Sequence, residues 1–171
     1  MTNQTNYLME TYKRLPVSFE KGEGVWLFDK NGNKYLDALS GIAVNTLGHN
    51  HPGLIKAITT QVSKLIHVSN YYNIEQQSLL AEKLVNFSKL SSVFFCNSGC
   101  EANEAAIKMA RLHANKLNID NSNIIVMEGG FHGRTMGTLS ASAGRNYQAG
   151  FEPLVSGFIR VPFDDIDAIS N

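Results

Sequence analysis

A serine and a glutamate three positions apart mark the first place in this chain where chemistry could be done. Ser98 and Glu101 have the S-x-x-E spacing of a capping box, which predicts a helix that begins just after Ser98. The backbone N–H groups of Gly99 and Cys100 would then lie at the electropositive end of the helix, without acceptors inside it. Such donors suit an anion, most often a phosphate, although an ordinary capped helix shows the same spacing.

A glycine-rich segment, 128–137, is the second candidate. It reads Glu-Gly-Gly-Phe-His-Gly-Arg-Thr-Met-Gly and surrounds an aromatic, an imidazole and a guanidinium side chain with four glycines. Phe131 could cover the face of a planar ligand, and Arg134 could hold a carboxylate through two parallel hydrogen bonds. The same residues also fit a flexible turn in which Phe131 fills the core, and the segment alone favours neither interpretation.

The elements around these segments form a strand–helix–strand pattern. Residues 93–96 are apolar, β-branched or aromatic and predict a short buried strand, and residues 123–128 predict a second one. The intervening helix carries an apolar stripe of Ala102, Ala105, Ala106, Met109 and Ala110. Strands joined in this way are expected to lie parallel in one sheet, so that the loops after both strands open on the same crevice.

The other elements are predicted from periodicity and turn residues. Asn31-Gly32 would supply the positive φ angles of a hairpin turn, and Asp164 or Asp165 could begin a final helix. The remaining predictions are helices at 5–14, 52–67 and 75–88, hairpin strands at 24–28 and 34–36, and a strand at 157–162.

Composition narrows the classes of protein. The chain is 43% hydrophobic and 18% charged, which is ordinary for a globular protein, and its 15 basic and 15 acidic residues give no electrostatic case for nucleic acid or an anionic membrane. Without a signal peptide or an apolar span, a cytoplasmic location is expected. Cys96 and Cys100 are expected to be reduced thiols, and His49 and His51 to hold a loop rather than a metal, since no third ligand is near.

Three segments resemble one enzyme family. Residues 94–111, Phe-Phe-Cys-Asn-Ser-Gly-Cys-Glu-Ala-Asn-Glu-Ala-Ala-Ile-Lys-Met-Ala-Arg, closely resemble the phosphate-binding segment of class III aminotransferases. Residues 131–135, Phe-His-Gly-Arg-Thr, resemble a second signature of that family, which follows the phosphate-binding segment at a comparable distance in the sequence. Residues 35–52 are similar to the N-terminal signature of its acetylornithine aminotransferase group.

The resemblance implies a fold, a cofactor and a set of site residues. The fold would be the fold type I pyridoxal-phosphate transferase, a three-layer α/β/α arrangement with a mostly parallel sheet. Residues 1–73 would form an N-terminal segment with a hairpin and a helix, and 74–171 the first half of the cofactor-binding large domain.

The resemblance also assigns roles to site residues. Ser98, Gly99 and Cys100 would hold the phosphate of pyridoxal 5'-phosphate, and the family usually has Ala or Thr at the position of Cys100. Phe131 would stack on the pyridine ring with His132 beside it, and Arg134 would bind the substrate α-carboxylate. Tyr71 and Tyr72 lie in a loop that the family places near the active site, but simple packing is the favoured interpretation.

The resemblance also implies that part of the catalytic machinery lies outside this chain. The family carries its Schiff-base lysine, its pyridine-binding aspartate and a phosphate contact from the partner subunit farther along a longer chain. No lysine here follows a buried strand into the predicted crevice, and Lys108 is expected to pair with Glu104 on its own helix. The chain is therefore expected to be an N-terminal fragment, inactive alone, with no catalytic lysine and no metal site.

The implied reaction is the transfer of the ω-amino group of N2-acetylornithine to 2-oxoglutarate, in arginine biosynthesis, by a homodimer. Two alternatives stay open: another transaminase of the family, acting on ornithine, succinylornithine, succinyl-diaminopimelate or 4-aminobutyrate, and a non-catalytic truncated module that binds phosphate or the cofactor.

Overall fold

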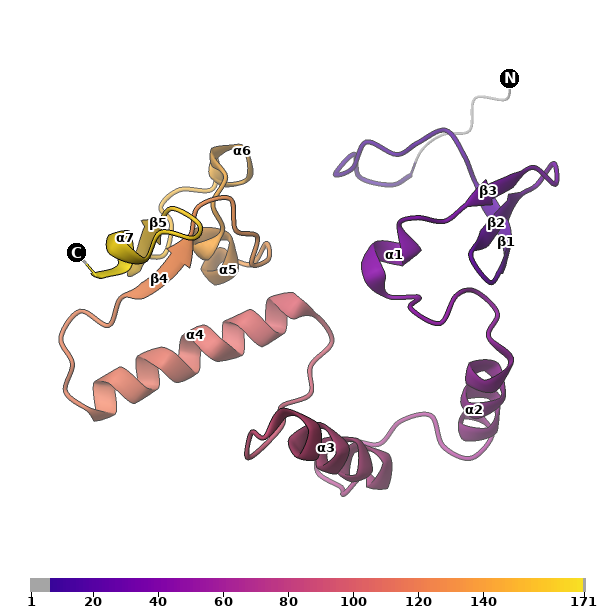
Figure 1. The fold of residues 1–171 in the computed structure, drawn as a ribbon, viewed down its shortest axis with the longest axis horizontal. Helices are drawn as coiled ribbons and strands as arrows, with labels where there is room; N and C mark the ends of the chain where they lie inside the picture. The colour runs from indigo at the N-terminus through magenta and orange to yellow at the C-terminus, as the bar shows by residue number, and fades with distance from the viewer. Residues whose placement is uncertain (1–6, 171) are drawn as a thin grey trace. The chain divides into compact units, whose positions relative to one another are not determined.

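The structure is a computed structural model that describes residues 7–170, and the chain divides into two compact units between Ile74 and Glu75. The N-terminal unit is built on a three-stranded antiparallel sheet of β1 (Phe19–Glu23), β2 (Trp26–Asp29) and β3 (Lys34–Leu36) (Figure 1). The predicted hairpin of β2 and β3 is confirmed, and β1 was not predicted.

The hairpin turn differs from the predicted one. Gly32 has a φ of 80°, but Asn31 is not among the residues with positive φ. The carboxylate of Asp29 instead accepts hydrogen bonds from the amides of Asn31 and Asn33, each at 2.9 Å. An aspartate that binds the backbone two residues on is an Asx turn, so Asp29 and Gly32 together set the turn.

The segment after β3 is a loop fixed by one carboxylate and one imidazole. Oδ2 of Asp37 lies 2.6 Å from Nε2 of His49, while Oδ1 accepts from the amide of Ser40 at 2.8 Å. His49 also exchanges two backbone hydrogen bonds with Gly24, at 2.7 and 2.9 Å, beside the sheet. The short helical turn α1 (Ser40–Ala43) lies within this loop and has positive φ angles throughout. The expectation that His49 holds the loop is confirmed.

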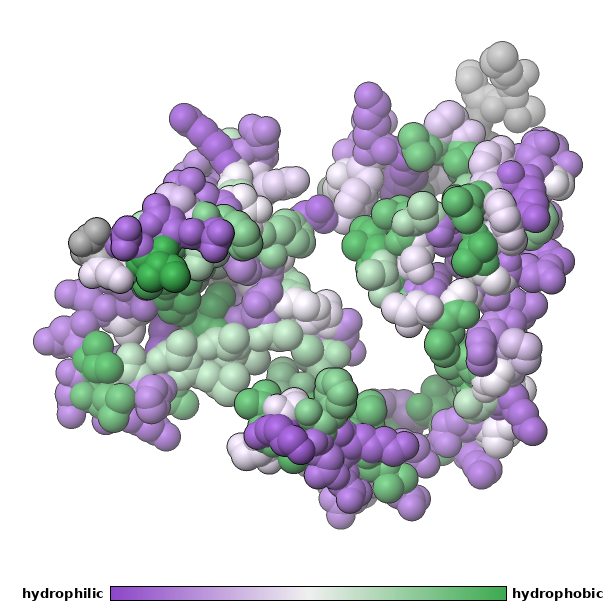
Figure 2. All heavy atoms as spheres, in the orientation of Figure 1, coloured by the Kyte–Doolittle hydropathy of each residue, from purple (hydrophilic) through white to green (hydrophobic). Residues whose placement is uncertain are grey.

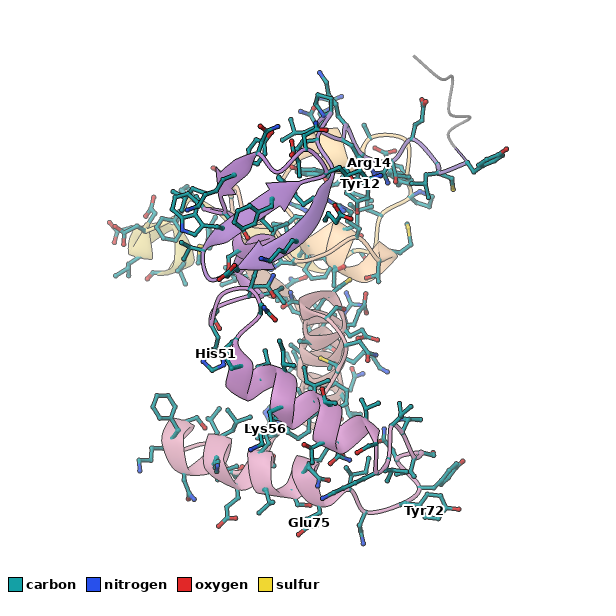
Figure 3. The ribbon with its side chains drawn as sticks, turned by 90° about the vertical axis from the view of Figure 1, so that its right-hand side faces the viewer. Tyr12, Arg14, His51, Lys56, Tyr72 and Glu75 are labelled. Carbon is teal, nitrogen blue, oxygen red and sulfur yellow. The ribbon has the colours of Figure 1, made fainter. Side chains whose placement is uncertain are left out.

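Helix α2 (Pro52–Val62) begins with His51, whose Nδ1 accepts from the amide of Leu54 at 3.3 Å (Figure 3). The helix ends at Val62 rather than at the predicted His67. Local hydrogen bonds compete with helix continuation there. The hydroxyl of Ser63 donates to the backbone carbonyl of Thr60, and the side-chain amide of Gln61 donates to the backbone carbonyl of Leu65. The helix predicted at 5–14 begins outside the described residues, and its described part, 7–14, is not helical, since so short a segment has little intrinsic helical stability.

The C-terminal unit contains α3 (Glu75–Ser88), which agrees with its prediction, and the long helix α4 (Gly99–Lys116). After α4 come β4 (Ile124–Met127), α5 (Met136–Ala141), α6 (Arg145–Gln148), β5 (Phe158–Val161) and α7 (Ile166–Ser170). β4 and β5 pair in parallel, with Ile124 opposite Phe158 and Met127 opposite Val161. Figure 1 shows α4 running alongside this pair and α5. The predicted strand at 157–162 is confirmed, and the carboxylate of Asp165 accepts from the amide of Ala168 at the start of α7.

The predicted strand at 93–96 is wrong. These residues form no ladder with any described strand, and Phe94 is 68% exposed. A strand exists only with a hydrogen-bonding neighbour, which this apolar segment lacks among residues 7–170. The parallel pair predicted on either side of α4 is instead β4 with β5, connected through α5 and α6. The α/β class with a parallel sheet is confirmed, and within the described chain that sheet has two strands.

The buried core is small and lies between α4, α5 and the two parallel strands. Its fully or nearly buried apolar residues are Ala114, Val126, Leu139, Ala141 and Val161. The predicted stripe on α4 is not buried in this core. Ala106 and Ala110 are exposed and line a pocket together with residues of β4, whereas Ala105 and Met109 line an open apolar hollow with Phe94 and Leu112. Figure 2 shows apolar side chains on the visible surface of both units. No helix among residues 7–170 is long and apolar enough to cross a membrane.

Candidate functional site: the start of α4 and the glycine-rich loop

Helix α4 begins where the capping box predicts. Ser98 is extended, with φ −156° and ψ 158°, and its hydroxyl accepts from the amide of Glu101 at 3.2 Å. The amides of Gly99 and Cys100 have no acceptor among residues 7–170. A Cβ placed on Gly99 would meet no atom within 4 Å, so the helix start is open rather than covered by side chains. Free donors at an open helix start are the arrangement that binds anions.

The carboxylate of Glu101 closes the cap one residue earlier than in the standard capping box. Its oxygens accept from the amide of Asn97 at 2.6 Å and from the side chain of Asn97 at 3.2 Å. These bonds, first that of the side chain, lower the pKa of Glu101, which is therefore ionised at neutral pH. Its charge opposes an incoming anion, while the hydroxyl of Ser98 is already committed to the cap.

One cavity of about 490 Å³ brings together the two segments that the sequence singled out. It is lined by Gly99, Cys100, Asn103, Phe131, His132, Gly133, Arg134 and Thr135. Five of the six predicted site residues therefore meet at one place. Ser98 is the exception, because it acts as the cap beside the cavity and is not part of its lining.

Phe131 presents its ring toward open space. The ring is 58% exposed and meets Tyr147 edge to face, with 6.2 Å between centroids. The guanidinium of Arg134 lies 5.5 Å from the Phe131 centroid. This cation–π contact places Arg134 beside the ring on which a planar ligand would stack. Phe131 does not fill the core, so the alternative interpretation of this segment as a simple core-packed turn is wrong.

The backbone amide and carbonyl of His132 are both hydrogen-bonded, whereas Nε2 of its ring has no hydrogen bond within residues 7–170. Its amide donates to the hydroxyl of Ser142 at 2.9 Å, and its carbonyl accepts from the side chain of Asn103 at 2.9 Å. Nε2 of His132 is buried without a hydrogen-bond partner among the described residues. A buried nitrogen without a partner costs free energy, and this one is enclosed by protein rather than exposed to the cavity.

The thiol of Cys100 lies in a polar contact between α4 and α5. Its Sγ is 3.2 Å from Oγ1 of Thr138 and 3.8 Å from that of Thr135. Hydrogen bonds, first that of Thr138 and then those of the Thr135 and Arg134 amides, lower the pKa of the Cys100 thiol to about 7. A Cβ on Gly133 would lie 2.5 Å from this sulfur, so the loop backbone approaches Cys100 as closely as glycine permits.

Three lining residues were not predicted: Asn103, Gly133 and Thr135. Asn103 lies three positions after Cys100 on α4, so a search for polar residues at i+3 and i+4 would have found it together with Glu104. The predicted pair of Glu104 with Lys108 is absent from the described chain. Glu104 instead accepts hydrogen bonds from the hydroxyl of Thr135 and from the amide of Thr138, the latter at 3.3 Å.

Other candidate residues are not among those that line this cavity. Tyr71 is 95% and Tyr72 69% exposed, and Figure 3 shows Tyr72 projecting from the segment that precedes α3. No lysine is among the residues that line the cavity. Within the described ranges, no group of three or more His, Cys, Asp or Glu residues is arranged to hold a metal ion.

Comparison with known proteins gives one family. A model of the family described as aminotransferase class-III matches residues 7–171. Acetylornithine aminotransferase of Nitrosomonas europaea is 60% identical over 165 residues, which cover 96% of this chain and 42% of the relative. Acetylornithine aminotransferase 1 of Bordetella parapertussis is 51% identical over 162 residues, covering 95% and 41%.

Solved structures agree. Ornithine aminotransferase of Toxoplasma gondii superposes with a TM-score of 0.89 at 29% identity, covering 95% of this chain and 39% of that one. An omega transaminase of Pseudomonas jessenii in complex with PMP superposes with a TM-score of 0.78 at 33% identity, covering 86% and 34%. The chain thus spans less than half of the length of the relatives that it matches.

Proposed function

Because this chain belongs to the class III aminotransferase family, we propose that the cavity between the start of α4 and the glycine-rich loop is part of a pyridoxal 5'-phosphate site. The proposed whole reaction is transfer of the ω-amino group of N2-acetylornithine to 2-oxoglutarate, a step of arginine biosynthesis. Support for this substrate comes from relatives of 50–60% identity that bear the acetylornithine aminotransferase name. The proposed assembly is a cytoplasmic homodimer.

The observation that carries the proposal is the pairing of free amides with an exposed aromatic ring in one cavity. The Gly99 and Cys100 amides suit the phosphate, and the open space over Gly99 leaves room for it. Phe131 offers a ring face to the pyridine, and His132 is another lining residue of the same cavity. The residues present therefore fit the cofactor.

Each of these residues has a binding or orienting task. Pyridoxal phosphate, when bound, supplies the electron sink that makes amino-group transfer possible. Gly99 and Cys100 anchor the phosphate, Phe131 sets the plane of the ring, and Arg134 binds the α-carboxylate of the amino acid. For Arg134 to do so, its guanidinium must share or leave its contact with Phe131. The lysine that such enzymes need is not supplied by the residues that line this cavity.

Pyridoxine 5'-phosphate tests the site in the chain as it is, because it carries the ring and the phosphate but no aldehyde that would react with surface lysines. Gly99→Pro removes one amide donor and suits the structure, since proline is favoured at the first helical position and the preceding Ser98 is already extended. A hydrogen bond to a charged group contributes about 1.5–3 kcal/mol, so binding should weaken about tenfold or more. Amide shifts of Cys100 in an NMR titration measure this affinity.

Two further variants serve as controls. Gly99→Ala keeps the amide and adds a methyl group in open space, so it should bind like the unaltered chain. Phe131→Leu should reduce the affinity for pyridoxine 5'-phosphate toward that for inorganic phosphate, because the stacking contribution is lost. Equal binding by the Gly99→Pro and Gly99→Ala variants would show that this amide does not bind the phosphate.

A further inference from the structure

Two adjacent polar residues of α4 form hydrogen bonds with the glycine-rich segment and with the start of α5. The side-chain amide of Asn103 donates to the carbonyl of His132 at 2.9 Å. The carboxylate of Glu104 accepts from the hydroxyl of Thr135 and from the amide of Thr138 at 3.3 Å. Arg134 lies between His132 and Thr135 in the sequence, so hydrogen bonds to α4 hold the chain on both sides of it.

Glycines in the loop and in α5 leave the space that these contacts require. A Cβ on Gly137 would lie 2.6 Å from Oε1 of Glu104, and one on Gly133 would lie 2.5 Å from Sγ of Cys100. Cys100 and Glu104 are one helical turn apart and therefore project on the same face of α4. The backbone therefore lies close to this face of α4 at Gly133, beside Cys100, and at Gly137, beside Glu104.

We infer that Asn103 and Glu104 are positioning residues that clamp the segment His132–Thr138 to the first two turns of α4. The clamp holds Phe131 and Arg134 at a set distance from the amides of Gly99 and Cys100. Since the same helix provides both the anion-binding amides and the clamp, the phosphate subsite and the ring-facing loop move as one body. The role of the clamp in ligand binding rests on the proposed cofactor site, whereas the clamp itself does not.

Hydrogen exchange measured on the 171-residue chain tests the clamp without any ligand. Asn103→Ala and Glu104→Ala should each speed exchange of the backbone amides of Thr135 and Thr138 about fivefold, the change expected when one net hydrogen bond is lost. Glu104→Gln keeps an acceptor oxygen at the same place and should restore most of the protection. Lys108→Ala, one turn farther along the same helix and without a hydrogen bond or ion pair to the loop among residues 7–170, should leave exchange unchanged. If Glu104→Ala prevents folding, Asn103→Ala and Thr135→Val test the same clamp from its other contacts.

Ligand binding shows whether Glu104 positions the ring-facing loop for the cofactor or only stabilises the fold. Glu104→Ala should weaken binding of pyridoxine 5'-phosphate several-fold and leave binding of inorganic phosphate unchanged, because only the ring-facing loop is released. Unchanged loop exchange in both alanine variants would overturn the clamp. An equal loss of both ligands in Glu104→Ala would overturn its positioning role. Failure of the unaltered chain to bind either ligand would count against the cofactor site while leaving the exchange result on the clamp intact.

Discussion

The sulfur of Cys100 and the hydroxyl oxygen of Thr138 lie 3.2 Å apart, which joins the start of α4 to α5. The contact stabilises the thiolate, and with the amides of Thr135 and Arg134 it lowers the pKa of Cys100 to about 7. Cys100 is also one of the residues that line the candidate site, so its ionisation can be followed as a probe of that site.

Alkylation of Cys100 should therefore depend on pH with a midpoint near 7. The thiolate is the reacting form, so the rate of carbamidomethylation should rise through that pH and level off above it. Thr138→Val removes the principal hydrogen bond and should move the midpoint upward, toward the ordinary value of 9.0. Mass spectrometry of the peptide that holds Cys100 gives the rate. A midpoint that stays near 9 in the unaltered chain would contradict the geometry around this sulfur.

Acid should loosen the loop between β3 and α2. The hydrogen bond with His49, followed by that with the Ser40 amide, lowers the pKa of Asp37 below its ordinary 3.8. A carboxyl group whose pKa is lowered by folding stabilises the fold above its unfolded pKa, and that contribution is lost as the pH falls below 3.8. The protection of the Ser40 amide, measured relative to an unstructured amide at the same pH, should fall in that range. Asp37→Ala removes the acceptor and should show weak protection of this amide already at pH 6, and an equally protected Ser40 amide in this variant would argue against the role of Asp37.

The sequence predicted the site better than the sheet around it. The start of α4 and the cap by Ser98 follow from local rules, because capping depends on neighbouring residues. Phe131 and Gly99 do line one cavity as expected, although one of the two strands from which their proximity was inferred does not form. The strand expected at 93–96 depends on a partner strand that the sequence pattern cannot specify, and Phe94 is exposed instead.

The contacts of Glu104 were missed for a related reason. A glutamate four residues before a lysine on a helix predicts a pair along that helix, which is a weak interaction at an exposed surface. The hydroxyl and amide donors at the start of α5 come from a segment distant in sequence, and only the folded loop brings Thr135 and Thr138 to Glu104. Hydrogen bonds from these distant residues replace the local ion pair with Lys108 that the helix spacing predicts.

Two leucines should show how unevenly stability is distributed in the C-terminal unit. Leu139 on α5 is 4% exposed, whereas Leu112 on α4 is 57% exposed. Leu139→Ala should lower the free energy of unfolding by about 2–5 kcal/mol, because it leaves a cavity in a small core. Leu112→Ala should change it by about 0.5 kcal/mol or less, and alanine also has the higher helix propensity. Urea denaturation followed by circular dichroism measures both, and similar losses in the two variants would show that Leu112 is covered in solution.

The role of Arg134 can be tested in a chimaera in which this chain replaces the matching segment of the acetylornithine aminotransferase of Nitrosomonas europaea, a relative that is 60% identical over that segment. The chimaera should transaminate N2-acetylornithine with 2-oxoglutarate in preference to ornithine, succinylornithine and 4-aminobutyrate.

In this chimaera, Arg134→Ala should raise the KM for N2-acetylornithine about tenfold or more, since a charge-assisted contact to the α-carboxylate is lost. The visible absorbance of the bound cofactor should stay intact. Arg134→Lys should recover only part of the affinity, because an ammonium cannot make the two parallel hydrogen bonds of a guanidinium. Loss of the cofactor absorbance in Arg134→Ala would instead assign Arg134 to the support of Phe131, whose ring its guanidinium contacts at 5.5 Å. A folded chimaera that binds the cofactor but transfers no amino group would favour the alternative of a non-catalytic binding module.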